Sequence, residues 1–107
     1  MQWWAKSAIF IIVSVIAWSA AAAETVSVSQ QNRKFMPDNL VISSGSSVHF
    51  INDDKVTHQI YVDSKVMTFY SEEQPMGKTI DVLFDHAGTF IVRCAIHPSM
   101  RLTVTVQ

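Results

Sequence analysis

The sequence predicts an all-β domain of about seven to eight short strands. Several segments alternate apolar and polar residues with a period of two, and turn-forming residues separate them. No segment has a helical period of useful length. Short alternating strands divided by turns are typical of a β-sandwich or a β-barrel, so both architectures stay open at this point.

The expected strands follow one another from residue 25 to the end of the chain. Residues 43–46, 53–55 and 85–88 are rich in Gly, Ser and Asp and are expected to form turns. Residues 64–76 are the least regular part, and we expect a short helix or a loop there. The segments with strand character are 25–29, 39–42, 48–52, 58–62, 78–84, 89–93 and 102–106.

The first 23 residues have the order of a secretory signal peptide. A start carrying Lys6 precedes an apolar run over residues 7–17, and small residues end at Ala23. An uncleaved membrane anchor is the alternative, but the apolar run is short for a membrane span. We therefore expect a cleaved signal peptide over residues 1–23, a domain over residues 24–107, a periplasmic location and no membrane anchor after cleavage.

The charge of the expected domain excludes one class of partner. The whole chain has 8 basic and 9 acidic residues. Removing Lys6 with the signal leaves seven basic and nine acidic residues, a formal charge of −2. A small domain without a basic field is not suited to bind nucleic acid.

Cys94 is the only cysteine, so an internal disulfide cannot form. Exported proteins usually pair their cysteines, because their compartment is oxidising. An unpaired cysteine there is a reactive thiol, an intermolecular link or a ligand of a metal. The metal is the interpretation that fits the surrounding residues.

Three residues with metal-binding side chains lie on one predicted loop, between the last two strands. Cys94, His97 and Met100 have the spacing Cys-x-x-His-x-x-Met, and His58 begins an earlier strand. Two imidazoles, one thiolate and a weak axial thioether make up a type 1 copper site, which takes one Cu(I)/Cu(II) ion. Structural zinc prefers four Cys or His ligands, so it suits this set less well. The remaining histidines, His49 and His86, are interpreted as surface residues.

The chain resembles the small blue copper proteins, the cupredoxins of the plastocyanin/azurin family, over essentially all of residues 24–107. The loop Cys94-x-x-His97-Pro98-x-Met100-Arg101 is most similar to that of the amicyanin group. This resemblance implies a Greek-key β-sandwich and the shuttling of single electrons between redox proteins. For amicyanins the donor is a periplasmic dehydrogenase, methylamine dehydrogenase, and the acceptor is a c-type cytochrome. Further matching residues are Phe35, Met36, Pro37, Leu40, Ile42, Gly45, Val48, Phe50 and Asn52, and later Ala87, Gly88, Thr89 and Phe90.

The loop also departs from the amicyanin pattern. Ala95 replaces a hydroxyl residue that helps to connect the ligand loop to the position of Asn52. Ile96 replaces a proline and keeps a backbone N–H that is available to the cysteine sulfur. We still expect Asn52 to brace the ligand loop from the second shell. Ser99 and Leu102 are further departures, so the redox partners are less defined than the metal.

Three functions are compatible with this set of residues. The favoured one is a monomeric electron carrier that turns over no substrate and so is not an enzyme. Met100 is then expected to set the potential, and His97 to be the ligand nearest the surface. The alternatives are a periplasmic copper-binding or copper-delivery protein, and a thiol enzyme that uses Cys94 with His97 or His58.

Overall fold

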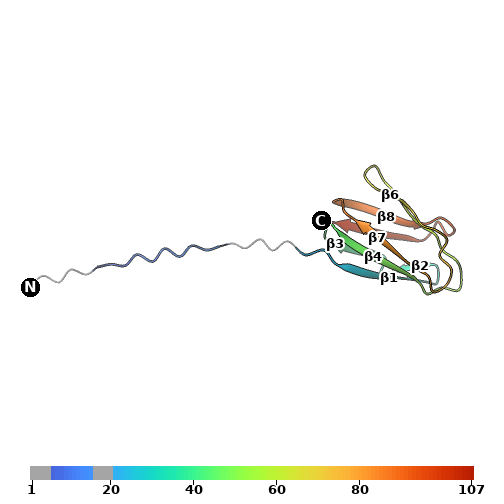
Figure 1. Ribbon diagram of the computed structural model, residues 1–107, viewed down its shortest axis with the longest axis horizontal. Helices are drawn as coiled ribbons and strands as arrows, with labels where there is room; N and C mark the ends of the chain where they lie inside the picture. Colours follow the sequence, from blue (N-terminus) through green and yellow to red (C-terminus); the bar gives the residue numbers. More distant parts are fainter. Residues whose placement is uncertain (1–5, 16–20) are drawn as a thin grey trace, which may run out of the picture.

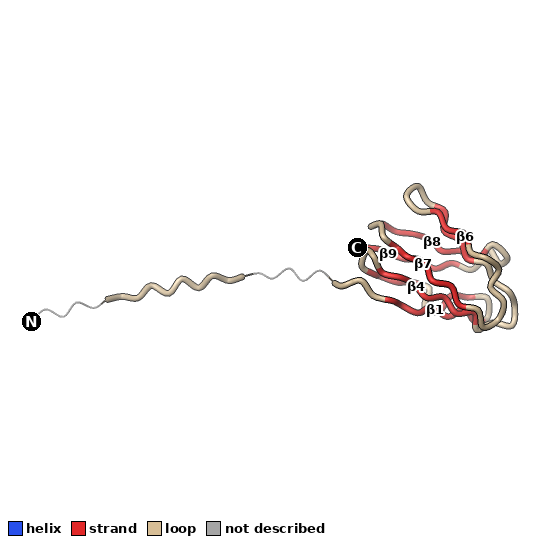
Figure 2. Tube along the Cα trace, viewed as in Figure 1, coloured by secondary structure: helices blue, strands red, loops and turns tan. Residues whose placement is uncertain are grey.

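Two β-sheets form the domain in the computed structural model, which describes residues 6–15 and 21–107 (Figures 1 and 2). One sheet has the strand order β2-β1-β4-β7 and the other the order β3-β9-β8-β5-β6. No helix occurs in the described residues. The all-β sandwich prediction is therefore confirmed. The strands are β1 (Thr25–Gln31), β2 (Lys34–Met36), β3 (Asn39–Ile42), β4 (Ser46–Asn52), β5 (Ile60–Asp63), β6 (Thr68–Tyr70), β7 (Thr79–Phe84), β8 (Gly88–Cys94) and β9 (Arg101–Val106).

Nine strands are present in the described residues, which is close to the expected number. The two additional strands, β2 and β6, have three residues each, too few to show a period of two. The region 64–76 holds β6 and loops, and the alternative of a short helix there is wrong. Strand β5 begins at Ile60, because His58 forms an isolated bridge with Gln74 instead of joining β5.

The segment before the sandwich is described only in part. Residues 6–15 have no regular secondary structure and have exposed side chains, whereas residues 1–5 and 16–20 of the expected signal peptide lie outside the described residues. Hydrogen bonds into the domain begin at Glu24, whose amide donates to Ser46 Oγ at 3.0 Å. In the described part of the chain no helix has the length and apolar character needed to span a membrane. The cleavage site after Ala23 stays a prediction.

The core is apolar in its middle and polar at one end. Strand β4 alternates strictly, and its inward side chains include Val48 and Phe50, both fully buried. At the end of the same strand, Asn52 is also fully buried. The other buried polar side chains near this end are Gln30, His58 and Gln74, each with 0% exposure.

The pairing of the strands places two loops, residues 53–59 and 95–100, at this polar end. Strand β1 runs parallel to β4 and pairs Gln30 with Asn52, where the loop 53–59 begins. Strand β8 runs antiparallel to β5 and pairs Cys94 with Ile60, where that loop ends. The loop 95–100 leaves β8 at the same point. Two segments far apart in the sequence are thus held side by side by backbone pairing.

The two buried glutamines give a matched test of this polar end. Both side-chain polar atoms of Gln30 lack a protein partner in the described structure, whereas only Oε1 of Gln74 does, since Gln74 Nε2 donates to the carbonyls of Phe50 and Lys78. An unpaired buried amide costs about 1–3 kcal/mol. We expect Gln30→Met to raise the free energy of unfolding of the metal-free protein by about that amount, and Gln74→Met to lower it by a similar amount. Urea denaturation of both variants is the measurement. A loss of stability in Gln30→Met as large as in Gln74→Met would contradict this prediction.

Candidate metal centre

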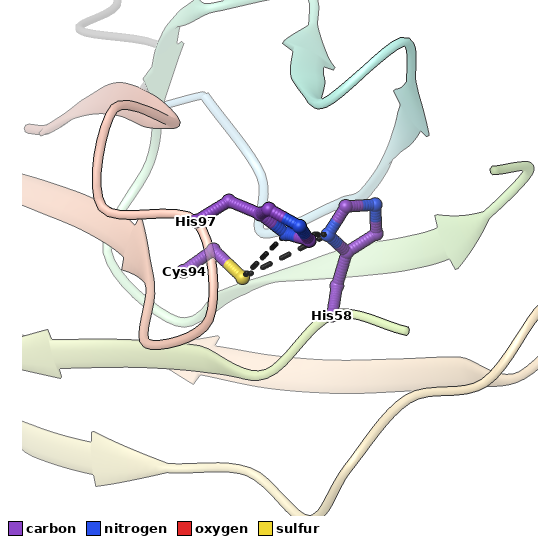
Figure 3. A group of neighbouring side chains, drawn as sticks. All are labelled: His58, Cys94 and His97. Atoms are coloured by element: carbon purple, nitrogen blue, oxygen red, sulfur yellow. Dashed lines mark hydrogen bonds between the residues drawn. The ribbon is translucent and has the colours of Figure 1, made fainter. Parts of the chain in front are cut away.

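Three metal-binding side chains converge at the polar end of the sandwich (Figure 3). His58 comes from the loop between β4 and β5, whereas Cys94 ends β8 and His97 lies on the loop that follows. The two Nδ1 atoms are 3.2 Å apart, and Cys94 Sγ lies 3.7 Å from Nδ1 of His58 and 4.0 Å from Nδ1 of His97. The structure therefore brings together three of the four residues predicted from the sequence as ligands, with one donor atom from each.

The size of this triangle fits a shared metal ion. Protein ligands hold a metal at about 2.0–2.1 Å through imidazole nitrogen and about 2.3 Å through thiolate sulfur. Donors at such distances around one centre are separated by roughly 3.2–4.0 Å when the angles at the metal are about 100–130°. The three observed separations lie in this range. Two imidazoles and one thiolate in a triangle are the trigonal donor set of a type 1 copper site.

His58 is fixed by a carboxylate on the side of the ring away from the triangle. Its side chain is fully buried, and Nε2 lies 2.9 Å from Asp54 Oδ2. An ionised carboxylate only accepts hydrogen bonds, so Nε2 carries the proton and the Nδ1 lone pair faces the site. The neutral tautomer that a metal needs is thus set by Asp54.

Asp54 is itself held in the charged form. Burial raises the pKa of its carboxyl, but hydrogen bonds from the Arg33 amide, the His58 ring and the Asn32 amide outweigh this effect and lower the pKa below the ordinary value. The two amide hydrogen bonds are 2.8 and 2.9 Å long. A carboxylate that stays ionised keeps its negative charge beside the buried ligand.

Cys94 is held by the end of the loop 53–59. It is fully buried, and its Sγ accepts a hydrogen bond from the Gln59 amide at 3.3 Å. The Ala95 amide in turn donates to the Gln59 carbonyl at 2.8 Å. The Ile96 amide, expected as one more donor to this sulfur, makes no hydrogen bond to it among the described residues, and the amide donor is that of Gln59. Hydrogen bonds to a sulfur stabilise its thiolate form, the form that binds metal.

His97 and Met100 lie on the loop 95–100, which is closed by a hydrogen bond from the Met100 amide to the His97 carbonyl at 3.0 Å. Met100 is 1% exposed and packs in the core, whereas His97 is half-buried. Desolvation lowers the pKa of His97, and the nearby charges of His58 and Arg33 lower it further. His97 therefore stays neutral, and available as a ligand, to lower pH than a free imidazole.

Asn52 braces the loop around His58. Its Nδ2 donates to the carbonyls of Val56 and Gln74, and its Oδ1 accepts from the Asp54 amide at 2.8 Å. Gln74 also exchanges two backbone hydrogen bonds with His58, at 2.7 and 3.0 Å. Asn52 therefore lies close to the site, as expected, but its side chain bonds to Asp54, Val56 and Gln74 and not to the ligand loop 95–100.

Sequence reasoning missed two residues of this arrangement, Asp54 and Gln74. The signal for Asp54 is its position four residues before His58, within the Asp-rich turn. No local pattern marks Gln74. The histidines interpreted as surface residues have solvent-accessible side chains, 30% exposed for His49 and 52% for His86. His49 on β4 contacts Asp81 on the adjacent strand β7, and His86 contacts its chain neighbour Asp85.

The fold and this donor set define the cupredoxins, a class of small copper proteins. The model of the cupredoxin-like domain matches residues 4–106, so the chain belongs to this family. Its cofactor is one copper ion, and the site is of the blue copper kind.

Known proteins similar to the chain point to an electron-carrying cupredoxin. The methylamine utilization protein MauL of Methylorubrum extorquens is 29% identical over 80% of this chain and 76% of that protein. Amicyanin of Paracoccus versutus is 23% identical over 86% of this chain and 72% of that protein. The structure of a reduced amicyanin variant superposes with a TM-score of 0.72 at 23% identity, over 78% of this chain and 82% of the other. At this identity the superposition supports the fold, and it confirms the predicted cupredoxin sandwich.

Two adjacent acidic residues allow the role of Asp54 to be tested. Asp54→Asn removes the charge beside His58, whereas Asp53→Asn removes an equal charge from a residue that contacts the Ser29 hydroxyl. Residues behind a metal ligand typically matter about 10- to 100-fold in metal affinity. We expect Cu(II) affinity, measured by competition with a chelator, to fall by about this factor in Asp54→Asn and to stay near its original value in Asp53→Asn. Equal losses in both variants would show that only the general charge of the loop matters.

Proposed function

We propose that the protein is a periplasmic type 1 copper protein that shuttles single electrons between redox proteins, as amicyanin does. In this proposal residues 1–23 are a signal peptide that is removed on export. His58, Cys94 and His97 are the trigonal copper ligands, and Met100 is the weak axial ligand. A periplasmic dehydrogenase is the proposed donor and a c-type cytochrome the proposed acceptor, in line with the similarity to amicyanin and to a methylamine utilization protein.

The single observation that carries this proposal is the convergence of three donor atoms within 3.2–4.0 Å of one another. Hydrogen bonds from the protein surround these donors: Asp54 orients His58, the Gln59 amide reaches the Cys94 sulfur, and Asn52 holds the loop between them. Ligands fixed in this way need little rearrangement when the charge of the site changes.

Bound copper supplies the one-electron couple, and the residues of the chain decide how the site exchanges that electron. His58 and Cys94 are fully buried and so exclude water from the site. His97 is half-buried on a surface loop, which makes it the ligand closest to a docked redox partner. The Met100 side chain is 1% exposed, so little of the proposed axial ligand meets water.

The same burial bears on the other candidate functions. A thiol enzyme needs a nucleophile that its substrate can reach, and Cys94 is 0% exposed. A copper-delivery protein needs ligands that open easily, whereas His58 is enclosed and connected through Asp54 to a neighbouring turn. Rapid transfer of copper to a chelator such as bathocuproine disulfonate would favour delivery over electron transport.

The absorption spectrum of the purified protein with added Cu(II) is the first test. A thiolate bound to Cu(II) beside two imidazoles gives an intense sulfur-to-copper band in the visible range. We expect one bound copper and an intense colour, and we expect Cys94→Ser to abolish this band. His86→Gln changes a surface histidine and should retain the full band. A strong unchanged band in Cys94→Ser would remove Cys94 from the site and overturn the proposed function.

The potential should depend on pH through His97. Protons and metal compete for the same imidazole nitrogen, and reduced copper holds this nitrogen less tightly than oxidised copper. Falling pH should therefore stabilise the reduced form and raise the potential. The lowered pKa of His97 moves this rise to the acidic side of the range for free imidazole. Voltammetry from neutral to acidic pH is the measurement, and His49→Gln, which lacks a surface histidine, should show the same curve. A potential that stays constant throughout would mean that His97 remains bound.

A further inference from the structure

A cavity with basic walls opens beside the proposed axial ligand. It has a volume of about 340 Å³, and the buried side chains of Phe35 and Met100 contribute to its lining. Three exposed cations, Arg33, Lys34 and Arg101, line the same cavity. The cavity therefore joins the outer surface to the residue next to the copper site.

The charge of this cavity differs from that of the whole protein. The chain has a net charge of −1, yet three of its 8 basic residues meet here, with Asp38 as the only acidic residue in the lining. None of the three cations takes part in an ion pair with any described residue. Their positive charge is therefore available to an incoming group.

Two of the basic residues that line the cavity are directly linked to the metal centre. Arg33 belongs to the turn between β1 and β2, and its amide donates to the Asp54 carboxylate that also accepts from His58. Arg101 follows Met100 directly and begins β9. A group bound in the cavity would thus contact Arg33, which is linked to His58 through Asp54, and Arg101, which is the chain neighbour of Met100.

We propose that this cavity is a docking site for carboxylate side chains on the surface of an acidic redox-partner protein, an inference that rests on the proposed electron-carrier function. The three cations are exposed, so water and salt screen their attraction to any single free anion. Several carboxylates on one protein surface act together, and complementary charges increase the association rate and orient the encounter. The partner would approach from the Met100 side of the ligand loop.

Two anionic probes that cannot exchange electrons test this site in the reduced, copper-loaded protein. Hexacyanochromate(III) is a paramagnetic trianion that broadens the NMR signals of nearby amides, and hexaglutamate is a carboxylate-rich competitor. We expect broadening centred on the cavity-lining residues Lys34, Ser99 and Arg101, and displacement of hexacyanochromate(III) by hexaglutamate. Lys34→Glu and Arg101→Glu should each weaken binding by about tenfold at low ionic strength. Lys65→Glu makes the same change of charge at an exposed lysine outside the cavity and should leave binding nearly unchanged.

Either of the two following results would overturn the proposal. Broadening at another surface, or an equal loss in Lys65→Glu, would show only a general attraction of anions. Binding of hexacyanochromate(III) that hexaglutamate cannot displace would indicate a site for free inorganic anions. An unchanged visible spectrum of the Cu(II)-loaded Lys34→Glu protein shows that the copper site is intact in that variant. Absence of the visible band from the Cu(II)-loaded protein would refute the proposed function, whereas the same NMR map of the metal-free protein would still decide whether the cavity binds carboxylates.

Discussion

The hydrogen bond between His58 Nε2 and Asp54, 2.9 Å long, connects the metal centre to the rest of the fold. The same carboxylate accepts the amides of Asn32 and Arg33, two residues with positive φ angles of 52° and 56°. Residues other than glycine adopt such angles at a cost, so the hydrogen bonds to Asp54 help to stabilise this turn. One ionised side chain therefore fixes the tautomer of a buried ligand and the shape of the β1–β2 hairpin. A change in either partner is transmitted to the other.

The polar end of the core replaces strand pairing with side-chain hydrogen bonds. Residues 53–59 form a loop between β4 and β5, so most of their backbone groups have no neighbouring strand to pair with. The Asn52 side chain contacts the backbone at 54, 56 and 74, and Gln74 pairs with His58 through its own backbone. Buried polar groups of this kind are stabilising only when they are satisfied, and then they specify one arrangement. The hydrogen bonds of Asn52 and Gln74 therefore help to fix the loop that carries His58.

The sequence predicts the parts of this structure that depend on local spacing. Alternation identifies the longer strands, and Cys94, His97 and Met100 lie on one loop with a spacing that few other sites share. Strands β2 and β6 escape prediction because three residues show no period. Asp54 and Gln74 escape it for a different reason. Their contacts with His58 depend on how two loops meet in space, which strand register decides and local pattern does not. Gln30 lies two residues after the buried Val28, so alternation places it on the inner face, but a glutamine side chain does not by itself indicate burial.

The two histidines are held very differently, and this asymmetry decides where the site can respond. His58 is fully buried, its ring is fixed by Asp54, and its backbone pairs with Gln74. His97 is half-buried and lies on a six-residue loop whose internal connection is the hydrogen bond from the Met100 amide. In the proposed copper site, His97 is therefore the ligand that can move on reduction, because His58 is held by both Asp54 and Gln74. In the proposed function, the ligand closest to a redox partner is then also the one that a proton can reach. In a site built this way the rate of electron exchange and its response to pH are properties of the same short loop, and its rigidity controls both.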